Sequence, residues 1–321
     1  MDIVLKHRNV RDFQVKDDIL GFYMIRLCEA KITVAGAKYL NINLGDATGE
    51  INAKLWEVTP GLAEKLSVGT IVRVMGVVID YQGTAQLKLE KIRTVNEEDN
   101  VDISDLIPAA PFDPEEMFEY LYDTANSFNN KDLKNITVKI LSKYKTKLLY
   151  YPGAKRNHHS IKAGLLYHTA TMLKTAQKVC EVYEFLNKEL LYAGVILHDI
   201  AKTDEMESNE FGIVEQYSIE GNLIGHIVKG AIIISKIGEE LNIDNELILL
   251  LSHMIISHHN NPEYGSPKYP LTPEAEMLHH LDMIDARMYD MQKATENMDC
   301  GAMSDKVWSL DGRQVYKSEK Y

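Results

Sequence analysis

Apolar and polar residues alternate along the first third of the chain, which is the pattern of half-buried β-strands. The alternation predicts strands at residues 21–35, 37–46, 48–57, 70–82 and 84–95, and a short helix at 60–66. Gly45 to Gly49 would join the second strand to the third, and Gly83 would join the last two. Five strands with a helix between the third and the fourth is the chain order of an OB-fold. We therefore predict an N-terminal all-β OB-fold barrel within residues 1–95.

The second and third predicted strands have one apolar face and one mixed face. The apolar face consists of Leu40, Ile42, Leu44, Ile51, Ala53 and Leu55. The other face carries Tyr39, Lys54 and Trp56 beside asparagines. Aromatic planes beside a cation hold single-stranded nucleic acid without reading its sequence, so we predict these three residues to bind nucleic acid. Two alternatives stay open: Trp56 closes the barrel end as a core residue, or the OB-fold binds an oligosaccharide or a protein.

The pattern changes after residue 95. Residues 96–116 hold eight acidic residues, no basic residue and three prolines, which indicates an acidic linker. Helical periodicity then predicts helices at 114–128, 131–148, 162–184, 188–200, 222–240, 244–258 and 273–295. We predict a multidomain chain in which an all-α bundle occupies residues 117–312 and a C-terminal tail occupies 313–321.

Composition excludes several classes of protein. No apolar run approaches the roughly 18 to 20 residues that a bilayer span needs, and the N-terminus lacks the apolar core of a signal peptide. A cytoplasmic location without a membrane partner is expected. The three cysteines are widely spaced and form no CxxC motif, which argues against a disulfide or a cysteine-based zinc site.

The net charge of -12 argues against a nucleic-acid partner, but its distribution weakens that argument. Residues 1–95 carry thirteen basic and eleven acidic residues. Residues 131–156 carry eight basic residues against Asp132 alone. A basic stretch therefore precedes the first histidine motif, although a solvated helix face would have the same composition.

Ten of the eleven histidines lie between His158 and His280. A lone histidine on an apolar helix is usually a hydrogen-bonded core residue. Here, however, imidazoles and carboxylates recur on apolar-periodic helices in the order His168, His198, Asp199, His226, His258 and Asp282. Both groups are ligands for divalent metals, and an adjacent His-Asp pair can place a carboxylate between two ions. The pattern favours a metal-dependent hydrolase.

The segments GLLYHTATML, YAGVILHDIAK and MLHHLDMIDARM resemble the HD-domain phosphohydrolase superfamily. The resemblance implies a first metal held by His168, His198, Asp199 and Asp282. We assign a second metal to His226 and His258, with Asp199 as the bridging and catalytic carboxylate. Two ions about 3.5–4 Å apart can bind a phosphodiester from both sides. Such ligands accept manganese, iron, cobalt or zinc, and manganese is the expected cofactor.

Other polar residues near these motifs have candidate roles. Lys202, one turn beyond His198, is a candidate catalytic residue that would contact a phosphate oxygen. Among the remaining histidines, His259 is the strongest candidate for a further ligand, and the sequence leaves the choice among His253, His258 and His259 open. Asp285 would orient a ligand imidazole through a hydrogen bond. His158, His159, His279 and His280 remain substrate contacts, supporting groups or core residues.

The OB-fold, the acidic linker and the motifs HHSIKAGLLYHT, LHDIAK, GHI, SHH and HLDMIDAR together resemble the YhaM family of bacterial 3′→5′ exoribonucleases over almost the whole chain. The resemblance implies single-stranded RNA as substrate, with single-stranded DNA as a second candidate. The chain departs from HD-GYP phosphodiesterases, because HHNNPEYGSPKYP contains no GYP and Gly164 replaces the glutamate that holds a third metal in some of them.

Two other functions stay open at this point. The first is an HD-domain nucleotidase or other small-molecule phosphohydrolase, in which the OB-fold serves assembly. The second is a nucleic-acid-binding protein without turnover. The complete ligand set and Lys202 favour catalysis over the second. The sequence fixes no oligomeric state, so a homo-oligomeric dimer or ring also stays open.

Overall fold

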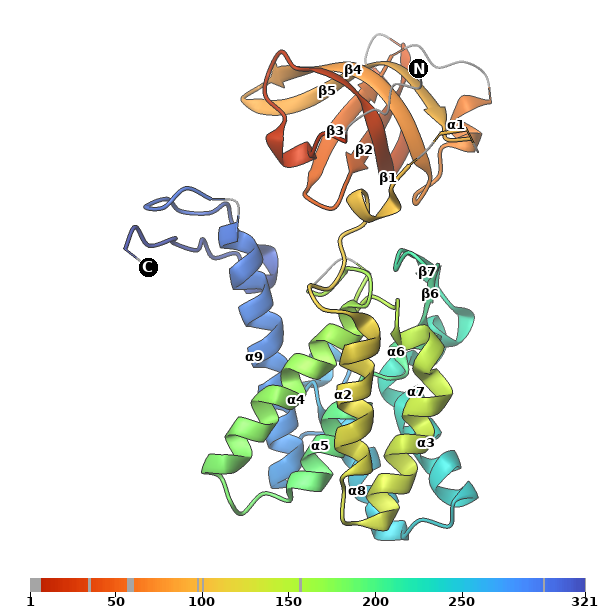
Figure 1. Ribbon diagram of the computed structural model, residues 1–321, viewed down its shortest axis with the longest axis vertical. Coiled ribbons are helices and arrows are strands. Elements are labelled where there is room, and N and C mark those ends of the chain that lie inside the picture. The colour runs from red at the N-terminus through yellow and green to blue at the C-terminus, as the bar shows by residue number, and fades with distance from the viewer. Residues whose placement is uncertain are drawn as a thin grey trace. The chain divides into compact units, whose positions relative to one another are not determined.

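The computed structural model describes residues 7–33, 36–56, 61–96, 98–99, 101–155, 158–296 and 298–320. The chain divides into two compact units, Met1–Ala109 and Ala110–Tyr321 (Figure 1). Their boundary falls inside the predicted acidic linker. The ends of predicted elements at residues 34–35, 57 and 60 lie outside the described residues, as do Arg156 of the basic stretch and Tyr321 of the predicted tail.

The first unit is a closed five-stranded barrel. Its elements are β1 (Asp18–Ile32), β2 (Lys38–Gly45), β3 (Glu50–Leu55), α1 (Leu62–Lys65), β4 (Ile71–Tyr81) and β5 (Thr84–Thr94). The strand order around the barrel is β1-β2-β3-β5-β4, and β4 pairs with β1 to close it. Only the β3–β5 pairing among these strands is parallel. The OB-fold predicted from the alternation is confirmed.

The interior of the barrel is built from the apolar face of the predicted strands. Leu40, Ile42 and Leu44 of β2 are buried, and they face Leu55, Ala53 and Ile51 of β3 in register. Because side chains on a strand alternate between its two faces, this register leaves the polar partners outside. Asn43 pairs with Asn52 there, and Asn41 pairs with Lys54. The predicted alternation is confirmed.

The first part of the predicted linker is ordered against the barrel. A 3-10 turn spans Ile103–Asp105. Ala47 N donates to Asp105 O at 2.9 Å, and Arg26 Nη2 donates to Leu106 O at 3.2 Å. These bonds satisfy main-chain carbonyls that irregular segments otherwise leave unpaired. The acidic segment is therefore partly a layer of the first unit.

The second unit is a helical domain with one small hairpin. Its elements are α2 (Pro114–Asn126), α3 (Lys131–Leu148), α4 (Gly164–Val182), α5 (Lys188–Leu197), α6 (Lys202–Glu205), β6 (Met206–Ser208), β7 (Val214–Tyr217), α7 (Ile219–Glu240), α8 (Asn245–Ser257) and α9 (Pro273–Glu296). The helical prediction is confirmed, with differences in detail. Neither the short helix α6 nor the β6–β7 hairpin was predicted. The chain also forms a turn after Leu197 where the prediction continued the helix to residue 200.

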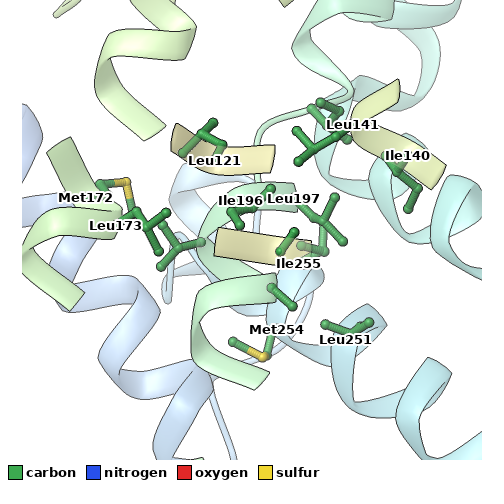
Figure 2. Close-up of a cluster of buried hydrophobic side chains, with 14 of the residues drawn as sticks. Leu121, Ile140, Leu141, Met172, Leu173, Ile196, Leu197, Leu251, Met254 and Ile255 are labelled. Carbon is green, nitrogen blue, oxygen red and sulfur yellow. The ribbon is translucent and has the colours of Figure 1, made fainter. Parts of the chain in front are cut away.

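Helix α5 lies at the centre of the helical domain. Its sequence KELLYAGVIL is apolar on almost every side, as a helix surrounded by others requires. It packs against α2, α3, α4, α8 and α9. Figure 2 shows its Ile196 and Leu197 among the surrounding side chains Leu121, Ile140, Leu141, Met172, Leu173, Leu251, Met254 and Ile255. The C-terminal end of α5 is therefore held firmly, and the next residue is His198.

None of the helices in the described part of the chain combines the length and the apolar character that a membrane crossing requires.

Candidate metal centre

Two of the predicted ligands stand at helix C-termini. His198 is the C-cap of α5, and its ring Nδ1 donates to Val195 O at 2.8 Å. His258 is the C-cap of α8, and its Nδ1 donates to Ile255 O at 2.6 Å. The last carbonyls of a helix lack intrahelical partners, so they are available to these rings. Both imidazoles are thereby fixed with Nε2 directed away from their own helix.

A first group of donor atoms joins α4, α5 and α9. His168 Nε2 lies 3.3 Å from His198 Nε2 and 3.3 Å from Asp282 Oδ1. One donor atom from each of the three residues lies within 4.8 Å of the others. His168 and His198 are buried, and the Asp282 side chain is 14% exposed. The structure therefore brings together three of the four residues that the resemblance assigns to the first metal, and Asp199 adjoins them.

A second group consists of His226, His258 and His259, whose ring nitrogens also lie within 4.8 Å of one another. His258 and His226 have ring centroids 5.9 Å apart, and His258 and His259 are 4.1 Å apart. His259 N also donates to Ser266 Oγ at 3.0 Å, which holds the turn after α8. The geometry makes His259 a candidate ligand beside the two histidines predicted for the second metal.

Asp199 lies between the two groups. Its Oδ2 lies 3.3 Å from His198 Nε2 and 3.9 Å from His168 Nε2. Its Oδ1 lies 3.4 Å from His226 Nε2 and 3.7 Å from His258 Nε2. One carboxylate thus presents one oxygen to each group, which is the geometry that a bridging ligand requires.

All four principal histidines have their Nδ1 occupied and their Nε2 directed into the centre. His168 Nδ1 donates to Asp285 Oδ2 at 2.7 Å, and His226 Nδ1 donates to Glu205 Oε2 at 2.9 Å. In His198 and His258 the acceptors are the carbonyls described above. A proton fixed on Nδ1 leaves the lone pair on Nε2, where a metal can accept it. The rings of His198, His226 and His258 thus share one tautomer, whereas His168 Nε2 also faces Asp282 Oδ1 at 3.3 Å.

Unpaired polar atoms test whether this donor set fits a metal. Among the described residues, the buried side-chain atoms without a hydrogen-bond partner include Asp199 Oδ1, His226 Nε2 and His258 Nε2. Leaving one such atom unsatisfied costs about 1–3 kcal/mol, and here three of them converge. Nitrogen and carboxylate oxygen together suit a divalent transition metal. The residues present therefore fit a divalent metal.

The carboxylates of the centre are held ionised. Burial raises the pKa of Asp199, but the charge of Lys202 and the contact with His198 outweigh it, so the pKa lies well below its ordinary value. Burial also raises the pKa of Asp282, and the hydrogen bond from His168 again reverses the effect. Burial lowers the pKa of His258 well below its ordinary value. Ionised carboxylates and a neutral imidazole are the forms that bind metals.

Asp285 supports the first group as predicted for an orienting carboxylate. Its Oδ2 accepts from His168 Nδ1 and from His159 Nε2, both at 2.7 Å. Burial raises the pKa of Asp285, but the two histidine hydrogen bonds lower it to about 2. Burial likewise lowers the pKa of His168, while Asp282 and Asp285 together raise it to about 9. The carboxylate thus keeps the His168 ring in one orientation.

Lys202 differs from its expected position. Its Nζ donates to Asp199 Oδ2 at 2.6 Å, and its side chain is only 13% exposed. The expectation was a cation available for a phosphate oxygen. Here the ammonium neutralises the carboxylate of Asp199. Burial lowers the pKa of Lys202, but the charge of Asp199 and the hydrogen bond to it outweigh this and raise the pKa. Lys202 therefore borders the centre as part of its charge balance.

The remaining histidines divide into near and remote ones. His158 lies near the first group, 6.1 Å between its ring and that of His168, and burial lowers its pKa to about 4. His253 Nε2 accepts from Leu271 N, and His279 Nδ1 donates to His258 O at 2.9 Å. His280 contacts Glu276 on the surface. These three act in the turns and helix surfaces around the centre.

The predicted residues of the barrel also lie together. The rings of Tyr39 and Trp56 are stacked with centroids 4.8 Å apart, and Trp56 is 46% exposed. Lys54 Nζ lies 5.7 Å from the centroid of Tyr39 and 4.7 Å from that of Tyr81. Lys88 of β5 is the register partner of Lys54. The outer face of β2 and β3 thus combines aromatic planes and cations at one place.

Two residues in these surroundings escaped the sequence analysis. Tyr81 extends the aromatic face, and its place at the β4–β5 hairpin beside a predicted cation could have suggested it. Glu205 holds His226, but it stands in the acidic run DEME, which has the composition of a solvated turn. No spacing rule marks it, because its partner lies 21 residues further along the chain.

Comparisons with known proteins agree with this division of the chain. Residues 28–95 match the family model for an OB-fold nucleic acid binding domain, and residues 165–287 match the model for the HD domain. The second match spans the candidate ligands from His168 to Asp282.

Solved structures match at low identity. A chain of a replication protein A heterotrimer bound to ssDNA is 16% identical over 27% of this chain and 64% of its own length, with a TM-score of 0.22. The second OB-fold domain of replication protein A from Methanococcus maripaludis is 18% identical over 30% of this chain and 98% of its own, with a TM-score of 0.23. A putative aspartyl-tRNA synthetase from Leishmania major Friedlin is 14% identical over 53% and 28%, with a TM-score of 0.22. This chain spans less than two thirds of the first and third of these.

Those three likenesses are too distant to bear on function, so the conclusion rests on the family models and on the geometry. The barrel has the closed strand order of an OB-fold, and the helical unit carries the His-Asp motif inside the matched segment. The chain therefore consists of an OB-fold domain followed by a helical HD domain, and the HD domain indicates a metal-dependent phosphohydrolase.

Proposed function

We propose that the chain is a metal-dependent 3′→5′ exoribonuclease that releases nucleoside monophosphates from single-stranded RNA. The observation that carries the hydrolytic part is the position of Asp199, with one oxygen toward each group of histidines. Strand binding is supported by the exposed face of Tyr39, Lys54 and Trp56. The direction of degradation and the preference for RNA rest on the resemblance to the YhaM family.

The ligands of this proposal follow the two groups of donor atoms. His168, His198 and Asp282 would hold the first metal, His226 and His258 the second, and Asp199 would bridge them. When bound, the two ions would supply Lewis acidity toward the phosphodiester and lower the pKa of an attacking water. Manganese is the proposed cofactor, with iron, cobalt and zinc as the alternatives that the same donor atoms accept.

The chain's own residues prepare this chemistry. Asp285, Glu205 and the helix carbonyls accept from the Nδ1 of each imidazole, which directs the four Nε2 atoms toward the centre. Lys202 neutralises part of the carboxylate charge and lies at the border of the centre, where it would face a phosphate oxygen. These groups are in place before any substrate binds, which is the condition for electrostatic stabilisation.

A preference for unpaired strands follows from the barrel surface. A base can stack on an aromatic plane only when it is unpaired, and each such base contributes roughly 1–3 kcal/mol. Opening DNA duplex costs about 1.4 kcal/mol per base-pair step. The sequence contains no GxxxxGK[ST] motif that would couple nucleotide hydrolysis to strand opening. The enzyme is therefore expected to stop near a stable stem.

The test uses a 5′-labelled RNA hairpin with a long single-stranded 3′ tail, incubated with the full chain and Mn²⁺. We expect a ladder of products that shortens from the 3′ end and ends near the stem, and no reaction without a divalent ion. Smooth digestion through the stem, or cleavage of a circular strand, would overturn the exonuclease proposal. Phosphate release from mononucleotides with the RNA left intact would identify the nucleotidase instead. A DNA version of the substrate measures the selectivity between the two sugars.

A further inference from the structure

Glu205 contacts His226 with both of its carboxylate oxygens. Oε2 accepts from His226 Nδ1 at 2.9 Å, and Oε1 accepts from the main-chain N of the same residue at 3.1 Å. Its side chain is 15% exposed, and that of His226 is 12% exposed. Two bonds from one rigid carboxylate fix the ring and the backbone of His226 together.

The start of α7 is fitted closely around Glu205. Ser218 N donates to Glu205 O at 2.9 Å. Gly221 approaches so closely that a Cβ there would lie 2.2 Å from the Glu205 carbonyl oxygen, so a larger residue would move the helix away. Gly225 has φ 69° and ψ 168°, a conformation that interrupts α7 and that favours glycine. The interruption turns His226 N toward Glu205 instead of into the helix.

The support of His226 differs from that of its neighbours. His198 and His258 donate to carbonyls of their own helices, which no side-chain replacement alters. His226 follows the interruption of α7 at Gly225, and the first N–H groups of a helical segment lack intrahelical partners. Its main-chain N–H and its ring Nδ1 donate instead to a side-chain acceptor from another element, Glu205 of α6.

We propose that Glu205 is the positioning residue that fixes the tautomer and orientation of His226, so that Nε2 is available to the second metal. The inference rests on the metal centre of the proposed function. His226 Nε2 is buried, has no hydrogen-bond partner, and lies 3.4 Å from Asp199 Oδ1. Glu205 acts only through His226, and the chain uses Gly221 and Gly225 to bring the two together.

Glu205→Gln tests this inference with little change in shape. Both partners of the carboxylate are N–H donors, so both oxygens accept. A glutamine has one acceptor oxygen and one NH₂ donor. If its oxygen keeps the main-chain bond, its NH₂ faces His226 Nδ1 and favours the opposite tautomer, with the proton on Nε2. The lone pair is then lost from the side that faces Asp199.

Two measurements on the full chain report separately on the tautomer of His226 and on metal binding. The first is the tautomer of His226 in metal-free protein, read from the ¹⁵N shifts of its imidazole. The second is a Mn²⁺ titration followed by electron paramagnetic resonance, which counts the bound ions and their affinities. Loss of an orienting partner of a metal-binding histidine typically weakens the metal about 10–100-fold. The same titration of His226→Ala identifies which of the bound ions depends on His226 as a ligand.

The chain offers two matched controls. Glu207→Gln makes the same chemical change two residues away, at an exposed position of β6 where the carboxylate accepts from Gln216 Nε2 at 2.7 Å. Asp204→Asn alters the neighbouring carboxylate of α6, which accepts from Tyr144 Oη and Lys147 Nζ at 2.8 Å each and so joins α6 to α3. The first should leave both readouts unchanged. The second lowers the thermal stability without acting on the His226 ring.

We expect the wild-type ring to carry its proton on Nδ1. In Glu205→Gln the proton should move to Nε2, and the ion that His226→Ala removes should bind about 10–100-fold more weakly while the other keeps its affinity. Wild-type affinity at both sites would overturn the inference. So would an equal loss at both sites with the same thermal destabilisation as in Asp204→Asn, since that outcome marks a structural role.

Neither measurement uses RNA, so the two proposals fail separately. Suppose that the wild-type chain binds two ions but leaves RNA intact, and that Glu205→Gln shows the change of tautomer. The nuclease proposal would then be wrong, and the proposed role of Glu205 would stand. A protein that shortens RNA as proposed, with Mn²⁺ binding unchanged in Glu205→Gln, would reject the role of Glu205 alone.

Discussion

The polar and aromatic groups on the outer face of the barrel are in contact with solvent, whereas those at the centre of the helical domain are mostly buried. On the barrel, Tyr39 and Trp56 stack on each other, and Lys54 lies near two aromatic rings, all of them in contact with solvent. In the helical domain, Asp199 is 3% exposed and its Oδ1 has no hydrogen-bond partner. The barrel groups contact one another, whereas the buried groups converge on a shared space.

This difference determines how strongly a substitution affects each region. Groups on an open surface contribute separately to nucleic-acid binding, so the others still bind when one is removed. Buried ligands depend on one another, because each lone pair is useful only where the others meet it. We therefore expect graded effects on the barrel and abrupt effects in the centre.

Asp199→Ala should produce the largest effect, because both halves of the centre share this carboxylate. Removing one preorganised stabilising donor already costs about 10²–10³-fold in turnover. We expect a loss of at least roughly 10³-fold with single-strand affinity unchanged, measured by initial rates of RNA shortening and by direct binding. Asp305→Ala, an exposed aspartate of the helical unit, is the control. Full activity in Asp199→Ala would contradict the two-metal centre.

Trp56→Ala should give an intermediate effect confined to binding. A stacked base is worth roughly 1–3 kcal/mol, so the dissociation constant for single-stranded RNA should rise about 5- to 150-fold, while the rate at saturating RNA stays within about twofold. Fluorescence anisotropy with labelled RNA measures the first quantity. The chain provides a matched tryptophan in Trp308, which is 91% exposed in the helical unit. An equal rise of the dissociation constant in Trp308→Ala would mean that the RNA does not bind specifically to the barrel surface around Trp56.

Lys54→Gln should give the smallest effect, visible mainly in the salt dependence. Each neutralised phosphate of a single strand contributes about 0.7 to the slope of log affinity against log salt. We expect the slope to fall by about that amount, with Lys65→Gln on α1 as the exposed control. An unchanged slope would mean that Lys54 serves the aromatic rings alone and does not reach a phosphate.

The sequence predicts the two folds and most of the centre because those features are periodic or local. Strand alternation places Leu40 and Leu44 inward, and helical periodicity places His168 and Asp282 on inward faces. His198 and Asp199 are adjacent in the chain, so their pairing needs no tertiary information. Each of these residues follows from a rule that acts over a few neighbours.

The missed features depend on contacts between distant segments. Glu205 contacts His226 only because α7 is interrupted at Gly225. A single glycine in an apolar segment of the sequence does not predict such an interruption. The β6–β7 hairpin has strands of three and four residues, too short for an alternation to be detected. The pairing of Lys202 with the Asp199 carboxylate was also not foreseen, and the predicted contact of Lys202 with a phosphate oxygen stays a prediction.

The position of α9 in the chain has a consequence for protein synthesis. Domains emerge and fold from the N-terminus as the ribosome works. The barrel can close once β5 has emerged, because the last of its strands ends at Thr94. The first group of donor atoms cannot form until Asp282 has been made, 114 positions after His168. An interrupted or proteolysed chain that lacks α9 therefore keeps its barrel surface but has an incomplete metal centre.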